Sequence, residues 1–535
     1  MLGKKKIRQL ALTDAMGWRQ RIPEDAFAHK LDRWAAANLK DEDYGDLYAE
    51  AGRPSIPPTL IIRAVIYQFH ENLSDRAMER ESGFSDLAKA ALDVNRDYAG
   101  LDASTLCRAR QRLFGEGAAL LAGTVENAKE LGILGEEASV AMDSYMVYGA
   151  AATQDTYTLL RRAIHKVMLA AGFAEMDGVL RPGLRRDDYG VRQKPRIDWD
   201  NPAERRQLLA SLVADARHLI EAVEKLEHAT EEMRAAAALL ARIVAQDIED
   251  AEDGPAIKQE VAKDRVISVT DVEMRHGRKT TATKFDGYKT HIAAAGPGHS
   301  LITAVEVTPA NGAESETVPS LLRQQEESGI EIKDLLGDTA YGGGDTRAFV
   351  AEKGIELVAK VPPATGRKGT FGKEEFVIDL EAMTCRCPAG QTAVKVYHGK
   401  DQRGRPVPVF VFATGTCEAC PLRKNCLSGK RRYRTVSLNY HEDLVQQARE
   451  KQHTDAFQDK YRQRAHVERT ICQCTRHGGR QGRFFGLAKN LFQQRIVAVG
   501  NNIDVLWRHL KKAGTAGKST AKANVFAPPR EQWAM

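Results

Sequence analysis

The 535-residue chain contains no run of about 18 apolar residues, so the sequence predicts no transmembrane helix. Its basic start, "MLGKKKIRQL", is not followed by the apolar stretch that a secretory signal requires. No P-loop pattern is present, so we expect no nucleotide cofactor and no ATP hydrolysis. These absences favour a cytoplasmic protein that has no membrane partner.

A strong excess of one charge sign is also absent. The 78 Lys and Arg residues exceed the 72 Asp and Glu residues by only 6. Such a mild excess does not by itself indicate a nucleic-acid partner, so the clustering of the charges matters more than their sum. One cluster is "KYRQRAHVERTICQCTRHGGRQGR" (460–483), in which a single acid, Glu468, lies among seven Lys and Arg residues.

Cysteine is scarce and unevenly placed, since five of the eight cysteines lie between positions 385 and 426. In a chain without an export signal, such a cluster favours metal ligation over a disulfide framework. We expect a structural Zn²⁺ held by Cys385, Cys387, Cys417 and Cys420, with Cys426 or His398 as alternative ligands. A set of reduced, unbound thiols is the competing interpretation.

The composition is that of a soluble globular protein, and the chain is long enough for two to four domains. Residues 1–130 read as short helices that end in an Arg-bearing one, which is typical of a helix-turn-helix-like DNA-binding domain; a helical packing domain is the alternative. "EEASVAMDSYMVYGA" (136–150) reads as a buried strand, and strands followed by alternating strand and helix return over 263–363. Together these segments predict a mixed α/β sheet.

Two insertions and a tail complete the predicted organisation. Residues 151–262 are helical, and apolar residues recur there in steps of three and four from Leu209 to Val244. This spacing predicts one long coiled-coil-like helix, whose partner the spacing does not identify. Residues 364–432 form the Cys-rich insertion, 433–512 a C-terminal helical part of the core, and 513–535 a flexible tail.

Three acids stand out as candidates for chemistry. Asp143 and Asp338 lie in or at the end of apolar strands, where an unpaired carboxylate is costly. Glu468 shares a helical face with Tyr461 and Arg464. If the three acids converge, their hard oxygen ligands suit a pair of Mg²⁺ ions that drive phosphoryl transfer, although many such aspartates are structural caps.

The motifs around these acids resemble those of bacterial insertion-sequence DDE transposases. "YRQRAHVER" (461–469) resembles the Y-x-x-R-x-x-x-E signature of that family, while "AMDSYMVYGA" (141–150) and "GDTAYGGG" (337–344) resemble its first-acid and second-acid motifs. "DVEMRHGRKTTATKFDGYKTHIA" (271–293) and "PPTLIIRAVIYQFHENLSDRAMER" (57–80) also resemble segments of the family. One departure is Thr475, at a position where the signature often has a basic residue; Arg476 is its neighbour.

The resemblance implies a ribonuclease H-like core in which Asp143, Asp338 and Glu468 bind two Mg²⁺ or Mn²⁺ ions. It implies cleavage at the transposon ends and transfer of the freed 3′-hydroxyls into target DNA. The implied partners are double-stranded DNA, as terminal inverted repeats and target, and a second copy in a homodimer. The implied location is the bacterial cytoplasm, at the nucleoid when the protein is bound to DNA.

Cations near these motifs are the expected DNA contacts, since they would neutralise phosphates. The expected set is Tyr461, Arg464, Arg469, Arg476, Arg108, Arg110, Arg112 and Lys289. Cys472 and Cys474 have no matching pair nearby, so we expect them to pack within the helix. Two other functions stay open: a catalytically silent, transposase-derived DNA-binding protein, and a ribonuclease H-like nuclease or resolvase.

Overall fold

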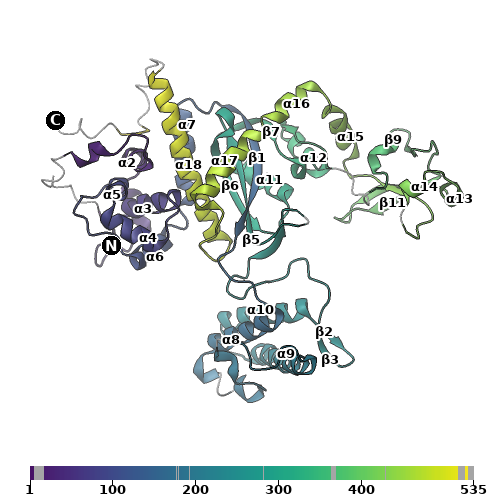
Figure 1. The fold of residues 1–535 in the computed structure, drawn as a ribbon, viewed down its shortest axis with the longest axis horizontal. Helices are drawn as coiled ribbons and strands as arrows, with labels where there is room; N and C mark the ends of the chain where they lie inside the picture. Colours follow the sequence, from purple (N-terminus) through teal and green to yellow (C-terminus); the bar gives the residue numbers. More distant parts are fainter. Residues whose placement is uncertain are drawn as a thin grey trace.

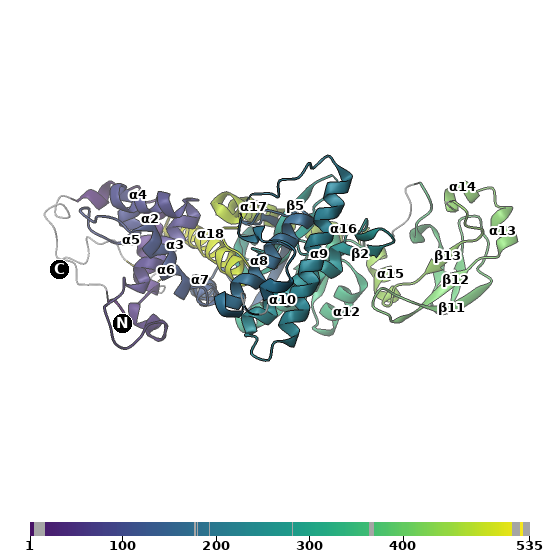
Figure 2. The ribbon, with the colours of Figure 1, turned by 90° about the horizontal axis from the view of Figure 1, so that it is seen from below.

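The computed structural model describes residues 1–4, 17–175, 178, 180–191, 193–280, 282–362, 369–427, 429–515 and 525–527. The protein is mixed α/β, as predicted. Both views place the N-terminal helices and the Cys-rich segment on opposite sides of a central sheet, and Figure 1 shows a helical insertion below it (Figures 1 and 2). In the part of the chain described, no helix has the length and apolarity needed to cross a membrane.

The N-terminal helices are α2 (Phe27–Asn38), α3 (Pro58–His70), α4 (Asp75–Phe84), α5 (Asp86–Leu92) and α6 (Ala103–Arg112). Pro58 opens α3, where the missing N–H of proline costs nothing. Ser74 and Ser85 cap α4 and α5 by accepting hydrogen bonds from backbone amides of the first turn. The side chain of Asp102 caps α6.

The central sheet has the strand order β4-β5-β1-β7-β8, with β6 paired to β5. Its strands are β1 (Glu137–Tyr148), β4 (Arg275–Arg278), β5 (Lys284–Ala295), β6 (Leu301–Pro309), β7 (Glu331–Leu336) and β8 (Glu356–Val358). Strand β5 is antiparallel to β1, β4 and β6, whereas β1, β7 and β8 run parallel. Both faces of β1 contribute to the main core, since its alternating side chains bury Val140 and Met142 on one face and Tyr145 and Val147 on the other.

Helices cover this sheet and connect it to the N-terminal helices. They are α7 (Gly117–Glu130), α11 (Val318–Glu327), α12 (Gly344–Glu352), α15 (Glu442–Lys451), α16 (Asp455–Arg462), α17 (Ala465–Cys474) and α18 (Leu487–Thr515). The long helix α18 contacts α2, α3, α7 and β6, so it lies between the N-terminal helices and the sheet (Figure 1). One hydrophobic cluster therefore runs through both parts.

The insertion departs from the prediction of one long helix. It consists of α8 (Thr156–Glu175), α9 (Pro202–Lys225) and α10 (Glu231–Asp247), followed by the hairpin β2 (Ile248–Ala251) and β3 (Gly254–Ile257). The apolar seam is interrupted because Thr230 leaves the helix and caps α10 through its hydroxyl, which accepts from the Met233 amide at 3.1 Å. Helices α8, α9 and α10 pack on one another around a core of their own, so the seam's partner is intramolecular.

The Cys-rich segment is a small β-rich unit with a third core. Its elements are β9 (Val377–Asp379), β10 (Thr384–Arg386), β11 (Lys395–Lys400), β12 (Pro406–Val411), α13 (Thr414–Glu418), α14 (Arg423–Cys426) and β13 (Thr435–Ser437). Phe376, Cys385, Phe410 and Phe412 are buried in this core. At the other end of the chain, within the segment expected to be a flexible tail, Val525 and Phe526 are buried; residues 516–524 and 528–535 lie outside the described residues.

Candidate active site

Asp143 lies in β1, and Asp338 follows the end of the adjacent parallel strand β7. The last registered pair between β1 and β7 is Ala141 with Leu336. Asp143 and Asp338 each follow that pair by two residues, and both line one cavity. Asp338 lies beyond the end of β7, where its carboxylate accepts a hydrogen bond from the Ala340 amide at 2.8 Å.

The third acid comes from helix α17, which contacts β1. Val467, Thr470 and Cys474 form the buried side of the helix, and the Thr470 hydroxyl donates to the carbonyl oxygen of His299 at 2.9 Å. This packing leaves Glu468, 59% exposed, on the side that faces the sheet acids. The buried Cys474 and the exposed Cys472 show that only the former packs within the fold.

Arg464 joins the acids of the two elements. Its Nη1 lies 3.2 Å from Asp143 Oδ2, and its Nη2 lies 2.9 Å from Glu468 Oε1. The residue occupies the N-cap of α17, just after the short break that separates α16 from α17. A single guanidinium is therefore the direct counter-charge of two of the three carboxylates, and its forked geometry suits this double contact.

The three acids and Arg464 line one cavity of about 520 Å³. Its wall also contains Lys289, which contacts Glu314 at 3.3 Å, and three further cations, Arg278, Lys279 and Arg480. Glu314 accepts a hydrogen bond from the Ser144 hydroxyl at 2.8 Å. Sequence reasoning missed Glu314 as a site residue, since its one local signal is that it shares the short turn before α11 with a second acid, Glu316.

Burial makes the charged forms of the two aspartates in the cavity costly. Burial raises the pKa of Asp143 to about 6, and the charges of Asp338 and Glu314 push it up as well, against the Ser144 amide and Arg464. Burial and Glu314 also raise the pKa of Asp338. Carboxylates that raise one another's pKa in this way are stabilised by a divalent ion, and their oxygens are the ligands that Mg²⁺ and Mn²⁺ prefer. Asp143, Asp338 and Glu468 supply the donor type for such an ion, but in the described chain their carboxylate oxygens do not all lie within 4.8 Å of one another, so binding would have to draw them together.

The other predicted DNA contacts differ in their exposure. Arg108 and Arg112 are exposed on α6, and Arg469 and Arg476 are exposed on α17 and on the π-helical turn η10 (Thr475–Gly479). Tyr461 is partly buried and stacks on Phe457. By contrast, Arg110 is buried, and its guanidinium donates to Asp75 and Gln68, so it joins α6 to α4 and α3.

The predicted zinc ligands separate into two groups. Cys387, Cys417, Cys420 and Cys426 line one small cavity of about 30 Å³, whereas Cys385 lies on β10 inside the core, where burial raises its pKa to about 11. His398 is exposed on β11. All eight cysteines are free. No three thiols in the described chain have their sulfur atoms all within 4.8 Å of one another.

Comparisons with known proteins place transposase families at both ends of the described fold. Residues 386–507, which include Glu468, match the family described as "Transposase DDE domain". Residues 17–112 match the family described as "Transposase domain (DUF772)". No curated protein and no solved structure matches the chain. The two family matches support a transposase function in general, and they confirm that the chain resembles an insertion-sequence DDE transposase.

Proposed function

We propose that the protein is a DDE transposase that cleaves DNA at transposon ends and transfers the 3′-hydroxyl ends into target DNA. The observation that carries this proposal is the shared cavity of Asp143, Asp338 and Glu468, which come from distant parts of the sequence. The sheet order supports a ribonuclease H-like core, because three antiparallel strands continue into two parallel strands at the position of the acids.

In this proposal Asp143, Asp338 and Glu468 hold two Mg²⁺ or Mn²⁺ ions. When bound, such ions activate a water or 3′-hydroxyl nucleophile and stabilise the leaving oxygen of an in-line displacement. Arg464 holds the carboxylates of β1 and α17 in position through its two ion pairs. The cations on the cavity wall, Arg278, Lys279, Lys289 and Arg480, attract the phosphates of the strand to be cut.

DNA contacts outside the cavity are assigned to exposed cations. Arg469 and Arg476 lie close in sequence to Glu468 and would hold the strand beside the acids, while Arg108 and Arg112 would contact duplex DNA from the N-terminal helices. Arg110 is assigned a packing role because its guanidinium is already bonded within the fold. Two transposon ends must meet during the reaction, so the active form is proposed to be a homodimer.

The thiol cavity is proposed to hold a structural zinc ion. Four cysteines around a space of ion size supply the donor set that Zn²⁺ prefers, and binding would draw the sulfur atoms together. The observed cavity favours Cys426 over Cys385 as the fourth ligand. A closed site with four thiolates has no open coordination position, so its role is to stabilise the Cys-rich unit.

The test of the transposase proposal is Asp338→Asn, which keeps the side-chain shape and removes the charge. The variant is expected to bind DNA of the element's terminal inverted repeats as the wild type does and to lose Mg²⁺-dependent cleavage. Binding is measured by gel shift and cleavage with an end-labelled duplex. Glu331→Gln, an exposed residue of β7, the strand that precedes Asp338, is the matched control and is expected to cleave normally.

The outcome also separates the two other functions. Cleavage by Asp338→Asn at the wild-type rate would overturn the metal-site assignment. Repeat binding without cleavage by the wild-type protein would indicate the silent DNA-binding protein. Cleavage of branched or hybrid duplexes, with no preference for the repeats, would indicate the nuclease.

A further inference from the structure

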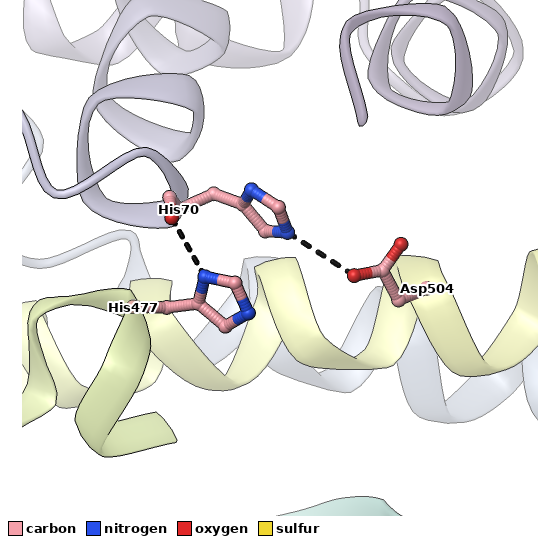
Figure 3. A group of neighbouring side chains, drawn as sticks. All are labelled: His70, His477 and Asp504. Carbon is pink, nitrogen blue, oxygen red and sulfur yellow. Dashed lines mark hydrogen bonds and ion pairs between the residues drawn. The ribbon is translucent and has the colours of Figure 1, made fainter. Parts of the chain in front are cut away.

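Two histidines and one aspartate lie together where the N-terminal helices contact η10 and α18 (Figure 3). His70 ends α3, His477 lies in η10, and Asp504 lies in α18. Each residue offers one ligand atom, and these three atoms all lie within 4.8 Å of one another. The Nε2 of His70 lies 3.1 Å from Oδ2 of Asp504. None of the three residues lines the acid cavity or the thiol cavity.

The outer nitrogen of each imidazole has its own acceptor. Nδ1 of His70 lies 2.9 Å from the carboxylate of Glu71, and Nδ1 of His477 lies 2.6 Å from the backbone carbonyl oxygen of His70. Each Nδ1 can therefore carry the proton and donate. The Nε2 of His477 then keeps its lone pair, whereas the Nε2 of His70 faces Asp504, where a bound ion would replace the hydrogen bond between them. Metal-binding histidines in proteins are oriented by the same kind of partner, a carboxylate or a carbonyl behind the ligand.

The ring of His70 is held in a fixed orientation. Phe27 of α2 stacks on it with a centroid distance of 3.4 Å, and the ring of His477 stacks on it with a centroid distance of 4.0 Å. The two imidazole planes differ by only 19°, so the ring of His477 must turn out of the stack for both nitrogens to reach one ion. The turn that carries His477 is also fastened, because Gln493 donates to the carbonyl of Gly478 at 3.0 Å. The His70 side chain is only 10% exposed.

The two carboxylate oxygens of Asp504 have different partners. Lys30 of α2 donates to its Oδ1 at 2.6 Å, whereas Oδ2 points to His70. The cluster contains the carboxylates of Glu71 and Asp504 against the single ammonium of Lys30, so one further positive charge, either a proton on His70 or a bound cation, would balance it.

We propose that His70, His477 and Asp504 form a binding site for a divalent transition-metal ion, and that Zn²⁺ is its natural occupant. Two imidazole nitrogens and one carboxylate oxygen are a zinc ligand set that leaves a fourth position for water. The ion would fasten α3 and α18 to the turn that follows the helix of Glu468, and so fix the N-terminal helices on the core. The proposal does not depend on transposase activity.

The competing interpretation is a cluster held by hydrogen bonds alone, in which a proton on His70 takes the place of the metal. The two are separated with Co²⁺, whose absorption reports its ligands. The full-length protein carries Cys417→Ser, Cys420→Ser and Asp143→Asn, which remove the thiol site and weaken the acid site. After dialysis against a chelator and then metal-free buffer, it is titrated with Co²⁺.

One equivalent of Co²⁺ is expected to bind, with visible d–d absorption and without thiolate-to-cobalt charge transfer. Asp504→Asn and His477→Gln in this background are each expected to weaken binding by more than about tenfold, because even second-shell changes cost about 10–100-fold. Glu71→Gln, which removes no ligand, is expected to weaken binding by a smaller factor. His509→Gln, on α18 outside the cluster, is the matched control and is expected to bind normally.

The proposal is overturned if this background binds no Co²⁺, or if Asp504→Asn and His477→Gln bind Co²⁺ as tightly as their parent. Far-ultraviolet circular dichroism shows whether each variant is folded. Asp504→Asn changes no side-chain size, so it keeps the test valid if His477→Gln fails to fold. Failure of this test would leave the cleavage assay of Asp338→Asn unaffected, and the reverse is equally true.

Discussion

At the scale of single residues, the acids could be found from the sequence, but their partners could not. Asp143 and Asp338 could be predicted because an unpaired carboxylate in or at the end of an apolar strand is energetically costly. Glu468 could be predicted because it is the one acid among seven cations. Glu314 and the double ion pair of Arg464 depend on contacts between segments that are far apart in the chain. No local pattern encodes such contacts.

Arg464 is the residue whose change tests this arrangement most directly. Arg464→Gln removes the cation that pairs with Asp143 and Glu468, so the two carboxylates lose their common partner. Cleavage is expected to fall by about 10²–10³-fold, the typical cost of removing one positioned hydrogen-bond donor from an active site. Single-turnover cleavage of labelled repeat DNA measures this loss.

The control for Arg464→Gln is Arg462→Gln. Arg462 is a highly exposed residue of α16 that pairs with Asp459, two positions before Arg464 in the sequence. It is expected to change cleavage by less than about threefold, since exposed ion pairs contribute little. Equal losses in both variants would show that a general loss of positive charge, and not the contacts of Arg464, causes the effect.

The choice among the cysteines is also a residue-scale question that spacing alone did not settle. Cys426→Ser is expected to remove one equivalent of zinc from the full-length protein, because its thiol lines the small cavity. Cys385→Ser is expected to keep the zinc, because Cys385 lies in the core on β10. Zinc per protein is measured by plasma mass spectrometry, and zinc loss in Cys385→Ser alone would restore the ligand set expected from the sequence.

At the scale of elements, periodicity predicted helices and strands better than it predicted their ends. Strand β1 and the caps Ser74 and Ser85 follow from local pattern, since alternation and capping are local effects. The seam from Leu209 to Val244 keeps its period through the loop at 226–230, so the pattern could not show that α9 and α10 are separate helices. The side chain of Thr230 caps the start of α10, which marks α10 as a separate helix.

Helix α16 is held to the edge of the sheet by a carboxylate between two lysines. Glu356 of β8 accepts from Lys451 and from Lys460, and Lys460 also contacts Asp334 at 2.9 Å. Hydrogen bonds from Lys451 and then Lys460 lower the pKa of Glu356 from 4.5 to about 2. This contact lies just before the Y-x-x-R-x-x-x-E segment, so it helps to place that segment against the sheet.

Glu356→Gln is expected to lower the free energy of unfolding by about 1 kcal/mol or less at pH 7, since the side chain is 34% exposed and solvent screens the pairs. A carboxylate whose folded pKa is depressed stabilises the protein above its unfolded pKa and loses that effect as pH falls. The difference between wild type and variant should therefore be full above about pH 4.5 and shrink toward pH 2.

Urea unfolding between pH 7 and pH 3 measures this difference. Glu352→Gln, at an exposed position of α12, is the matched control and is expected to match the wild type at every pH. A difference for Glu356→Gln that stays constant down to pH 3 would mean that the lysine contacts do not lower the pKa of Glu356.

At the scale of the whole molecule, the order of the segments could be predicted, but their packing could not. The sequence distinguished an N-terminal helical part, a split sheet and two insertions, and each insertion has its own core. The N-terminal helices, in contrast, share one hydrophobic cluster with the sheet through α18. Composition does not indicate this shared core, because the apolar residues of α18 could equally have packed in the core of a separate N-terminal domain.

This shared core gives a prediction for DNA binding, since it fixes the exposed cations of α6 relative to those near Glu468. If both groups contact one duplex, the logarithm of the binding constant falls linearly with the logarithm of salt concentration, by about 0.9 per phosphate contact. Arg108→Gln with Arg112→Gln, and separately Arg469→Gln with Arg476→Gln, should each reduce that slope by about 2. Fluorescence anisotropy of a labelled repeat duplex at several salt concentrations measures the slopes.

The combination of all four changes decides whether the two groups act on the same duplex. One rigid footprint predicts that the reductions add, to a total of about 4. Arg76→Gln, an exposed arginine of α4, controls for the loss of charge as such and should leave the slope unchanged. If only the two changes in α6 reduce the slope, the duplex is bound by the N-terminal helices alone. The cations near Glu468 would then have to contact the strand only at the step of cleavage, after the duplex is already held.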